Sequence, residues 1–153
     1  MKKIVLGILC CLMFGLQIDT VLANEDEKII IDYETIEEGE YTIEIETYEI
    51  EIVQTRSSSI KKGGRDYHYK DKNGKIVWTA TLTGTFEYNG TTSKCISASV
   101  SVSNVSSGWQ LFTKKASTSG NQAKASIIMR ETSTMALHPV NFTLSCSPTG
   151  SLY

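Results

Sequence analysis

The sequence predicts an all-β protein: an antiparallel β-sandwich that follows a cleavable leader. Three observations support this fold class. Apolar and polar residues alternate strictly from Trp78 to Tyr88, with threonines at every second position from 79 to 85, which is typical of a half-buried strand. A second alternating segment, 95–103, places Ile96, Ala98, Val100 and Val102 between serines. Beyond the leader, no segment shows the 3.6-residue apolar period of a helix.

The chain begins with the features of a signal peptide. Two lysines at positions 2 and 3 precede an uncharged apolar run over residues 4–16, and Val21-Leu22-Ala23 supplies small residues at a cleavage site. We expect cleavage after Ala23 and a secreted product, extracellular or bound to the cell wall. The alternative is an uncleaved anchor, but the run is shorter than the roughly 20 residues that span a membrane. The mature chain contains no further span.

Residues 24–53 form an acidic segment ahead of the main body. We expect a mobile arm over residues 24–40, with a short strand at 29–31, and then an edge strand over 41–53. The face occupied by the isoleucines changes near Thr47 and Tyr48, which predicts a bulge or a twist there. Residues 54–65 are rich in serine, glycine and lysine and are predicted to be a flexible basic linker.

Residues 66–153 are predicted to be the body of the sandwich. Strands are expected at 66–70, 75–88, 95–103, 109–115, 122–130 and 140–146, with an irregular connection over 132–139. Asp71-Lys72-Asn73-Gly74 predicts a hairpin turn between the first two of these strands. The regular spacing of short strands indicates a sandwich or a small barrel.

Charge is divided unevenly along the chain. Residues 24–53 contain twelve Asp and Glu and a single lysine, a net charge of −11, whereas residues 54–153 contain twelve Lys and Arg and four carboxylates, a net charge of +8. One hypothesis is that the acidic segment packs against the basic body and screens it until a protease cuts the linker, which would describe a guarded toxin or antimicrobial protein. The simpler alternative is that residues 41–53 are an integral strand, with core isoleucines and solvated glutamates.

The mature chain keeps two cysteines, Cys95 and Cys146. In an exported chain such a pair predicts a disulfide, which would stabilise the fold by roughly 3–4 kcal/mol in the chain-entropy model. The alternative is a pair of buried free thiols.

Two resemblances follow from particular residues. The segments WTATLTGTFEYNGTTSKC and TLSCSPTG resemble small secreted proteins of unknown function from Gram-positive gut bacteria; this likeness implies export, a similar fold over roughly residues 75–150 and the same disulfide pairing. The order of Cys95, Trp109 and Cys146 resembles the Cys…Trp…Cys core of immunoglobulin domains, which implies a broadly immunoglobulin-like sandwich.

Catalytic and metal-binding signatures are sparse. The two histidines, His68 and His138, stand without the closely spaced Cys, His or carboxylate partners of a zinc site, so neither metal nor cofactor is predicted. No G-x-S-x-G elbow accompanies the many serines, and no D-x-D-x-D-G calcium loop accompanies the glutamates. We therefore expect no enzyme, with a hydrolase of the cell envelope as the less favoured alternative.

One aromatic and cationic cluster is a candidate binding patch. Its residues are Arg65, Tyr67, Tyr69, Lys70, Lys72 and Lys75, and the alternative is that one face of this hairpin belongs to the core. Such patches bind sugars and anionic polymers. The predicted function is non-enzymatic binding outside the cell, with an anionic cell-surface polymer or glycan as the expected kind of partner; no nucleic-acid motif is present.

Overall fold

The computed structural model describes residues 27–50 and 59–153, which form eight β-strands. These are β1 (Lys28–Glu38), β2 (Tyr41–Ile50), β3 (Ser59–Lys70), β4 (Ile76–Tyr88), β5 (Ser93–Ser103), β6 (Trp109–Ser119), β7 (Gln122–Glu131) and β8 (Leu137–Ser145). Every pairing between neighbouring strands is antiparallel. Within these two ranges, no helix is long and apolar enough to cross a membrane. The predicted signal peptide, residues 1–23, lies outside the described residues.

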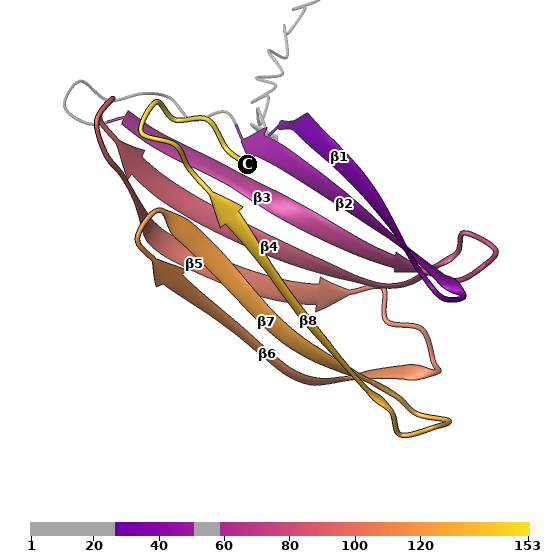
Figure 1. Cartoon of the computed structure of the whole chain (residues 1–153). Coiled ribbons are helices and arrows are strands. Elements are labelled where there is room, and N and C mark those ends of the chain that lie inside the picture. Colours follow the sequence, from indigo (N-terminus) through magenta and orange to yellow (C-terminus); the bar gives the residue numbers. More distant parts are fainter. Residues whose placement is uncertain (1–26, 51–58) are drawn as a thin grey trace, which may run out of the picture.

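The strands form two sheets, with the order β1-β2-β3-β4-β5 in the larger and β6-β7-β8 in the smaller. Residues 104–108 carry the chain from one sheet to the other, and the smaller sheet packs over β3, β4 and β5. Figure 1 shows the two layers, with β1 at the outer edge of the larger sheet. The prediction of an antiparallel β-sandwich is therefore confirmed. Since five strands face three, the inner side of β1 and β2 extends beyond the covering sheet.

The connectivity differs from that of an immunoglobulin domain. Each sheet is a meander in which strands adjacent in sequence are also adjacent in space, whereas immunoglobulin sandwiches use Greek-key connections. The expected Cys…Trp…Cys core is also not formed. Trp109 opens β6, while the amide of Cys95 donates to the carbonyl of Gly120 beyond the far end of that strand, a separation of roughly 35 Å for eleven residues. The spacing of these three residues in the sequence matches that of an immunoglobulin domain, but the strand arrangement places Trp109 and Cys95 at opposite ends of β6.

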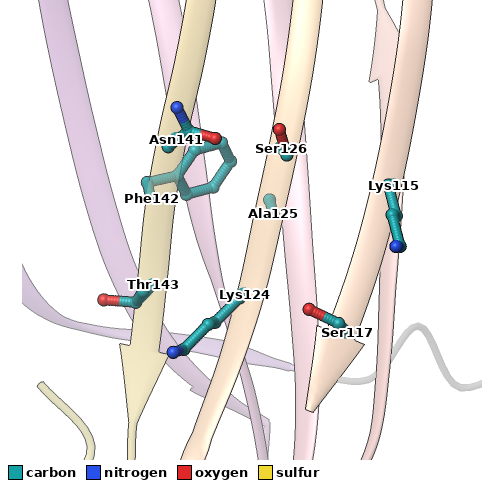
Figure 2. Close-up of a pocket in the computed structure, with 8 residues that line it drawn as sticks. All are labelled: Lys115, Ser117, Lys124, Ala125, Ser126, Asn141, Phe142 and Thr143. Atoms are coloured by element: carbon teal, nitrogen blue, oxygen red, sulfur yellow. The ribbon is translucent and has the colours of Figure 1, made fainter. Parts of the chain in front are cut away.

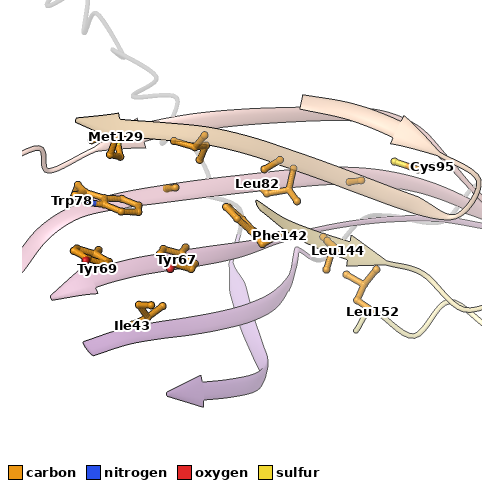
Figure 3. Packing of buried hydrophobic residues seen from close by; sticks show 14 of the residues in the cluster. Ile43, Tyr67, Tyr69, Trp78, Leu82, Cys95, Met129, Phe142, Leu144 and Leu152 are labelled. Atoms are coloured by element: carbon orange, nitrogen blue, oxygen red, sulfur yellow. The ribbon is translucent and has the colours of Figure 1, made fainter. Parts of the chain in front are cut away.

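The core lies between β3 and β4 of the larger sheet and β7 and β8 of the smaller one (Figure 3). Strict alternation in β4 sends Trp78, Leu82 and Phe86 inward, where each has no exposed surface, and sends the threonines outward. From the opposite sheet, Ile127 and Met129 of β7 are equally buried. Burial of these large side chains is the main stabilising contribution to the fold.

The described part of the acidic segment belongs to the larger sheet as β1 and β2. β2 pairs with β1 on one side and, from Thr42 to Ile50, with β3 on the other, so the expectation of an edge strand over residues 41–53 is wrong: the edge is β1. Ile43, Thr47, Tyr48 and Ile50 are buried. The expectation of a mobile arm over residues 24–40 is wrong for its described part, because residues 28–38 form β1. The predicted irregularity near Thr47 and Tyr48 is present, but the extra residue belongs to β1: the register shifts between Ile30 and Asp32, opposite this pair.

The described part of the predicted linker is also strand. Residues 59–65 form the first half of β3, and residues 51–58 lie outside the described ranges. Gly63 and Gly64, which suggested a loop, are needed here for close packing. A Cβ atom on Gly64 would overlap the ring of Tyr48, and a Cβ on Gly63 would overlap the side chain of Leu152. Glycine is therefore required at these positions because other side chains pack directly against the backbone, and it does not indicate a flexible loop.

The remaining boundaries differ by a few residues. The hairpin at 71–74 is confirmed: Gly74 has a φ of +76°, and the Asp71 carboxylate accepts the amides of Asn73 and Lys75 at 2.9 and 3.0 Å. β6 continues to Ser119, and β8 begins at Leu137, inside the segment expected to be irregular. In both cases the pairing with β7 extends the strand beyond its predicted bounds.

Candidate functional site

The predicted aromatic and cationic patch is divided between opposite sides of the larger sheet. Tyr67 and Tyr69 point inward and are 7% and 2% exposed, so they belong to the core. Lys70 lies on the outer face and pairs with Glu44. Lys72 and Lys75 are exposed near the β3–β4 turn. The expectation of one shared patch is wrong, because alternation along β3 separates residues that are close in sequence.

The two tyrosines stack in a row with their neighbours. Tyr69 lies between Tyr41 and Trp78, with ring centroids 4.7 and 4.9 Å away. Tyr67 lies between Trp78 and Phe142, at 5.4 and 5.6 Å. Both faces of each ring are therefore occupied by protein. Because sugars and bases bind to aromatic side chains through the ring face, these tyrosines do not offer a stacking platform.

Arg65 joins the two sheets. Its Nε donates to Thr47 Oγ1 at 2.9 Å, and its Nη1 donates to the carbonyl oxygen of Thr143 in β8 at 2.8 Å. Burial lowers the pKa of this guanidinium, while the carboxylates of Asp32 and Glu34 act in the opposite direction. Arg65 therefore has a structural position between the sheets instead of a surface position for a ligand.

The charge imbalance is partly compensated by ion pairs between the acidic segment and β3. Lys61 Nζ lies 2.6 Å from Glu49, Lys28 Nζ lies 3.2 Å from Asp66, and Lys70 contacts Glu44. The hydrogen bond from Lys70 is the largest cause of the lowered pKa of Glu44. The acidic segment thus packs against basic residues, as one hypothesis proposed, but it does so as paired strands and not as a detachable cover.

The two histidines occupy different sheets and different environments. His138 in β8 packs against Trp109, with ring centroids 4.7 Å apart. His68 in β3 lies with its Nδ1 3.1 Å from Thr79 Oγ1 and its Nε2 3.8 Å from Glu46. This places a hydroxyl, an imidazole and a carboxylate in line, but Thr79 is 5% exposed. A substrate cannot reach that oxygen without local opening, so the arrangement does not form a nucleophilic site.

A shallow pocket of about 510 Å³ lies on the outer face of the smaller sheet (Figure 2). Because Ala123, Ala125 and Ile127 of β7 point into the core, Lys124 and Ser126 point outward. Register then places Ser117 opposite Lys124, and Lys115 opposite Ser126. β8 completes the pocket with an amide, a hydroxyl and a ring. These residues are Asn141, Thr143 and Phe142.

The lysines of this pocket differ from three lysines of the larger sheet. Lys28, Lys61 and Lys70 each have a carboxylate partner. Among the residues that the structure describes, Lys115 and Lys124 make no ion pair. Hydroxyl and amide donors surround them, and no carboxylate lines the pocket. This arrangement favours an anionic ligand with several hydrogen-bond acceptors.

Sequence reasoning did not identify this site. Lys115 follows Lys114 in a basic pair that belongs to no motif, and the alternation of β7 indicates that Lys124 faces outward. The pairing of Ser117 with Lys124 depends on the tight turn at Gly120, which has a φ of +59°. The strands expected at 109–115 and 122–130 leave the whole of residues 116–121 as the connection, so the register of β6 on β7 does not follow from the sequence alone.

A second hollow of about 480 Å³ lies where the larger sheet extends past the smaller one. Ile36 and Ile45 line one side, and Leu137 and Val140 of β8 line the other. Its volume results from the unequal number of strands in the two sheets. The described residues lining this hollow are mostly apolar and include no lysine or arginine, which distinguishes it from the pocket on the smaller sheet.

Cys95 and Cys146 are free thiols in this structure, so the predicted disulfide is not formed. Both are buried, and each thiol donates to a nearby backbone carbonyl, Cys95 to Ser97 at 3.2 Å and Cys146 to Ser147 at 3.4 Å. The expectation relied on export, on the presence of two cysteines and on the resemblance to small secreted proteins, whereas a buried cysteine also packs well as a small apolar side chain.

Burial raises the pKa of both thiols, which predicts slow chemical labelling of the folded protein. Because the thiolate is the reactive form, a chain beginning at Asn24 should react with a thiol reagent at pH 8 far more slowly when folded than in urea. An added thiol at an exposed position, Ser101→Cys, should react rapidly in the folded state. If urea exposes no thiol under non-reducing conditions, the two cysteines are joined and the free-thiol state is excluded.

Comparison of the chain with protein-family models, with curated proteins and with solved structures finds no match. The class of the molecule is therefore defined by its own architecture: an antiparallel β-sandwich of two meanders with a basic pocket on the outer face of the smaller sheet.

Proposed function

We propose that this protein is an exported, non-enzymatic binding protein, and that the outer face of β6–β8 holds an anionic polymer or glycan of the cell surface. Lys115 and Lys124 carry the proposal, because their charges have no carboxylate partner among the described residues and flank a pocket of hydroxyl and amide groups. The leader in the sequence supports action outside the cell.

The form of the site favours an extended ligand over a small enclosed molecule. The pocket lies on an open sheet surface and is crossed by three strands, so a polymer can pass over it in contact with both lysines. Regularly spaced phosphate or carboxylate groups would meet the two ammonium groups, while hydroxyl-bearing units would meet Ser117, Ser126 and Asn141. Binding of this kind is electrostatic in part and weakens as salt screens it.

The test compares two charge-matched double variants in binding to poly(glycerol phosphate). Each lysine near a polyanionic surface contributes about 1 kcal/mol, so Lys115→Gln with Lys124→Gln should weaken binding roughly 30-fold. Lys72→Gln with Lys75→Gln removes the same charge from the exposed β3–β4 turn and should change the affinity much less. Affinity should also fall between 50 and 300 mM NaCl, because the Debye length shortens about 2.5-fold over this range.

Two outcomes would contradict this assignment. Equal losses in the two double variants would mean that overall charge, and not this pocket, determines binding. A failure of the unmodified protein to bind the phosphate polymer at low salt, together with failure to bind a carboxylated glycan such as polygalacturonate, would exclude the proposed ligand class. Neutral dextran serves as the control polymer, because it offers hydroxyl groups without charge.

A further inference from the structure

Three potential metal ligands gather on the face of the larger sheet that points away from the core. Glu46 of β2 is directly opposite Asp66 of β3, and His68 follows two residues later on the same face. One ligand atom from each residue lies within 4.8 Å of the others. His68 Nε2 and Glu46 Oε2 are 3.8 Å apart. The three residues are 22 positions apart at most, and strand pairing brings them together.

Asp66 provides an independent indication that this cluster is incomplete. The residue is 8% exposed, and its Oδ2 accepts a hydrogen bond from Lys28 Nζ at 3.2 Å. Its Oδ1 is buried and makes no hydrogen bond, while the Tyr48 hydroxyl interacts with the same carboxylate. A buried carboxylate oxygen without a partner is energetically costly, and such groups usually have a proton donor or a bound cation.

The imidazole of His68 is held in an orientation suited to a ligand. Its Nδ1 lies 3.1 Å from Thr79 Oγ1, which is itself buried and within 3.4 Å of Asn104 Nδ2. When Nδ1 carries the proton and donates to Thr79, the lone pair of Nε2 is directed at the carboxylates. A hydrogen bond from the second ring nitrogen is the usual way in which proteins orient a metal-binding histidine.

We propose that Glu46, Asp66 and His68 bind a divalent transition metal ion of the zinc type. One imidazole with two carboxylates suits Zn²⁺ and its neighbours, whereas Ca²⁺ and Mg²⁺ require mainly oxygen ligands. At ligand distances of about 2.1 Å, tetrahedral coordination separates its ligand atoms by about 3.4 Å. The cluster therefore has to contract by roughly 1 Å, and the Glu46 side chain, which is 35% exposed, is free to turn.

Lys28 is the competing cation of this site. Its ammonium lies against Asp66 Oδ2 and also 4.2 Å from the centre of the Tyr48 ring. A metal ion on Oδ1 leaves Lys28 as a nearby positive charge that opposes binding. The cation–π contact with Tyr48 can hold the ammonium after a bound metal ion has replaced its contact with Asp66. Three protein ligands also leave a fourth coordination position open to water.

The test is calorimetric titration of the tag-free full-length protein with ZnCl₂ at pH 7, together with thermal unfolding. We expect one ion per chain and a rise in Tm with zinc concentration. His68→Ala and Asp66→Asn should weaken binding at least tenfold, and Thr79→Val, which removes the support of the ring, should weaken it by roughly 10–100-fold. His138→Ala, which removes the other histidine, is the matched control and should bind as the unmodified chain does.

A charge variant tests whether Lys28 competes with the metal ion for Asp66. Lys28→Met removes the competing ammonium and retains an apolar contact with Tyr48, so it should tighten zinc binding. The unmodified protein and Lys28→Met keep all three ligands, so the result does not depend on variants that fail to fold. Absence of stoichiometric binding by the unmodified chain, or equal affinity in His68→Ala, would overturn the proposal.

Discussion

A truncated chain that begins at Arg65 is expected to remain unfolded or to precipitate. It lacks β1, β2 and the first half of β3, and with them the buried side chains Ile43, Thr47, Tyr48 and Ile50. Full burial of each large apolar side chain contributes about 1.5–3 kcal/mol, and the total stability of a domain is about 5–15 kcal/mol. Loss of β2 also exposes Tyr69, which stacks on Tyr41. Far-UV circular dichroism and amide NMR dispersion provide the measurement.

A milder truncation is the matched control for this experiment. A chain that begins at Tyr41 loses only β1, in which every residue is exposed, and keeps β2 paired with β3. It should fold, with reduced stability because the pair of Lys28 and Asp66 is lost. If the chain beginning at Arg65 folds as well as this control, the acidic segment is dispensable. That result would support the hypothesis that the acidic segment screens the basic body and is released by a protease.

Replacement of Trp78 by alanine is expected to lower the free energy of unfolding by about 3–5 kcal/mol. The indole has no exposed surface, and it stacks against both Tyr67 and Tyr69 at interplanar angles of 10° and 12°. The substitution leaves a cavity in the centre of the aromatic row, where the rigid sheets cannot close fully. Urea denaturation followed by circular dichroism measures the change in midpoint.

Two further variants show whether the loss comes from packing. Trp78→Phe retains a stacked ring and removes an indole N–H that is buried without a hydrogen-bond partner, so it should cost less than alanine. Phe112→Ala removes an aromatic ring that is 57% exposed and should change stability by less than about 0.5 kcal/mol. Similar losses at Trp78 and Phe112 would show that the aromatic row is not the centre of the core.

The strands and their faces could be predicted where alternation was regular. In β4 and β7 the apolar positions are the buried ones, and the hairpin at 71–74 follows from its own residues. Prediction failed where local composition resembled a loop. One example is the segment of residues 61–64, which lies within β3. Tyr48 and Leu152 occupy the space that side chains at Gly63 and Gly64 would need. Nothing in the neighbouring sequence indicates these contacts, because both partners are distant along the chain.

Residues 28–38 are a similar case on a larger scale. All their side chains are exposed, so no burial pattern distinguishes them from a solvated acidic arm. They form β1 because their backbone pairs with β2, and that pairing depends on β2 being held by β3. An edge strand of this kind is stabilised by its neighbour more than by its own composition.

The sequence by itself determined the all-β class, the inward faces of the central strands and the separation of charge between the two parts of the chain. Only the tertiary structure decided which charges meet. It pairs Lys61 and Lys70 of β3 with glutamates of β2 and places Asp66 and His68 beside Glu46. It leaves Lys115 and Lys124 on the opposite sheet without carboxylate partners among the described residues. The physical reason is register: alternation assigns each side chain to a face, but only pairing between strands assigns it a neighbour.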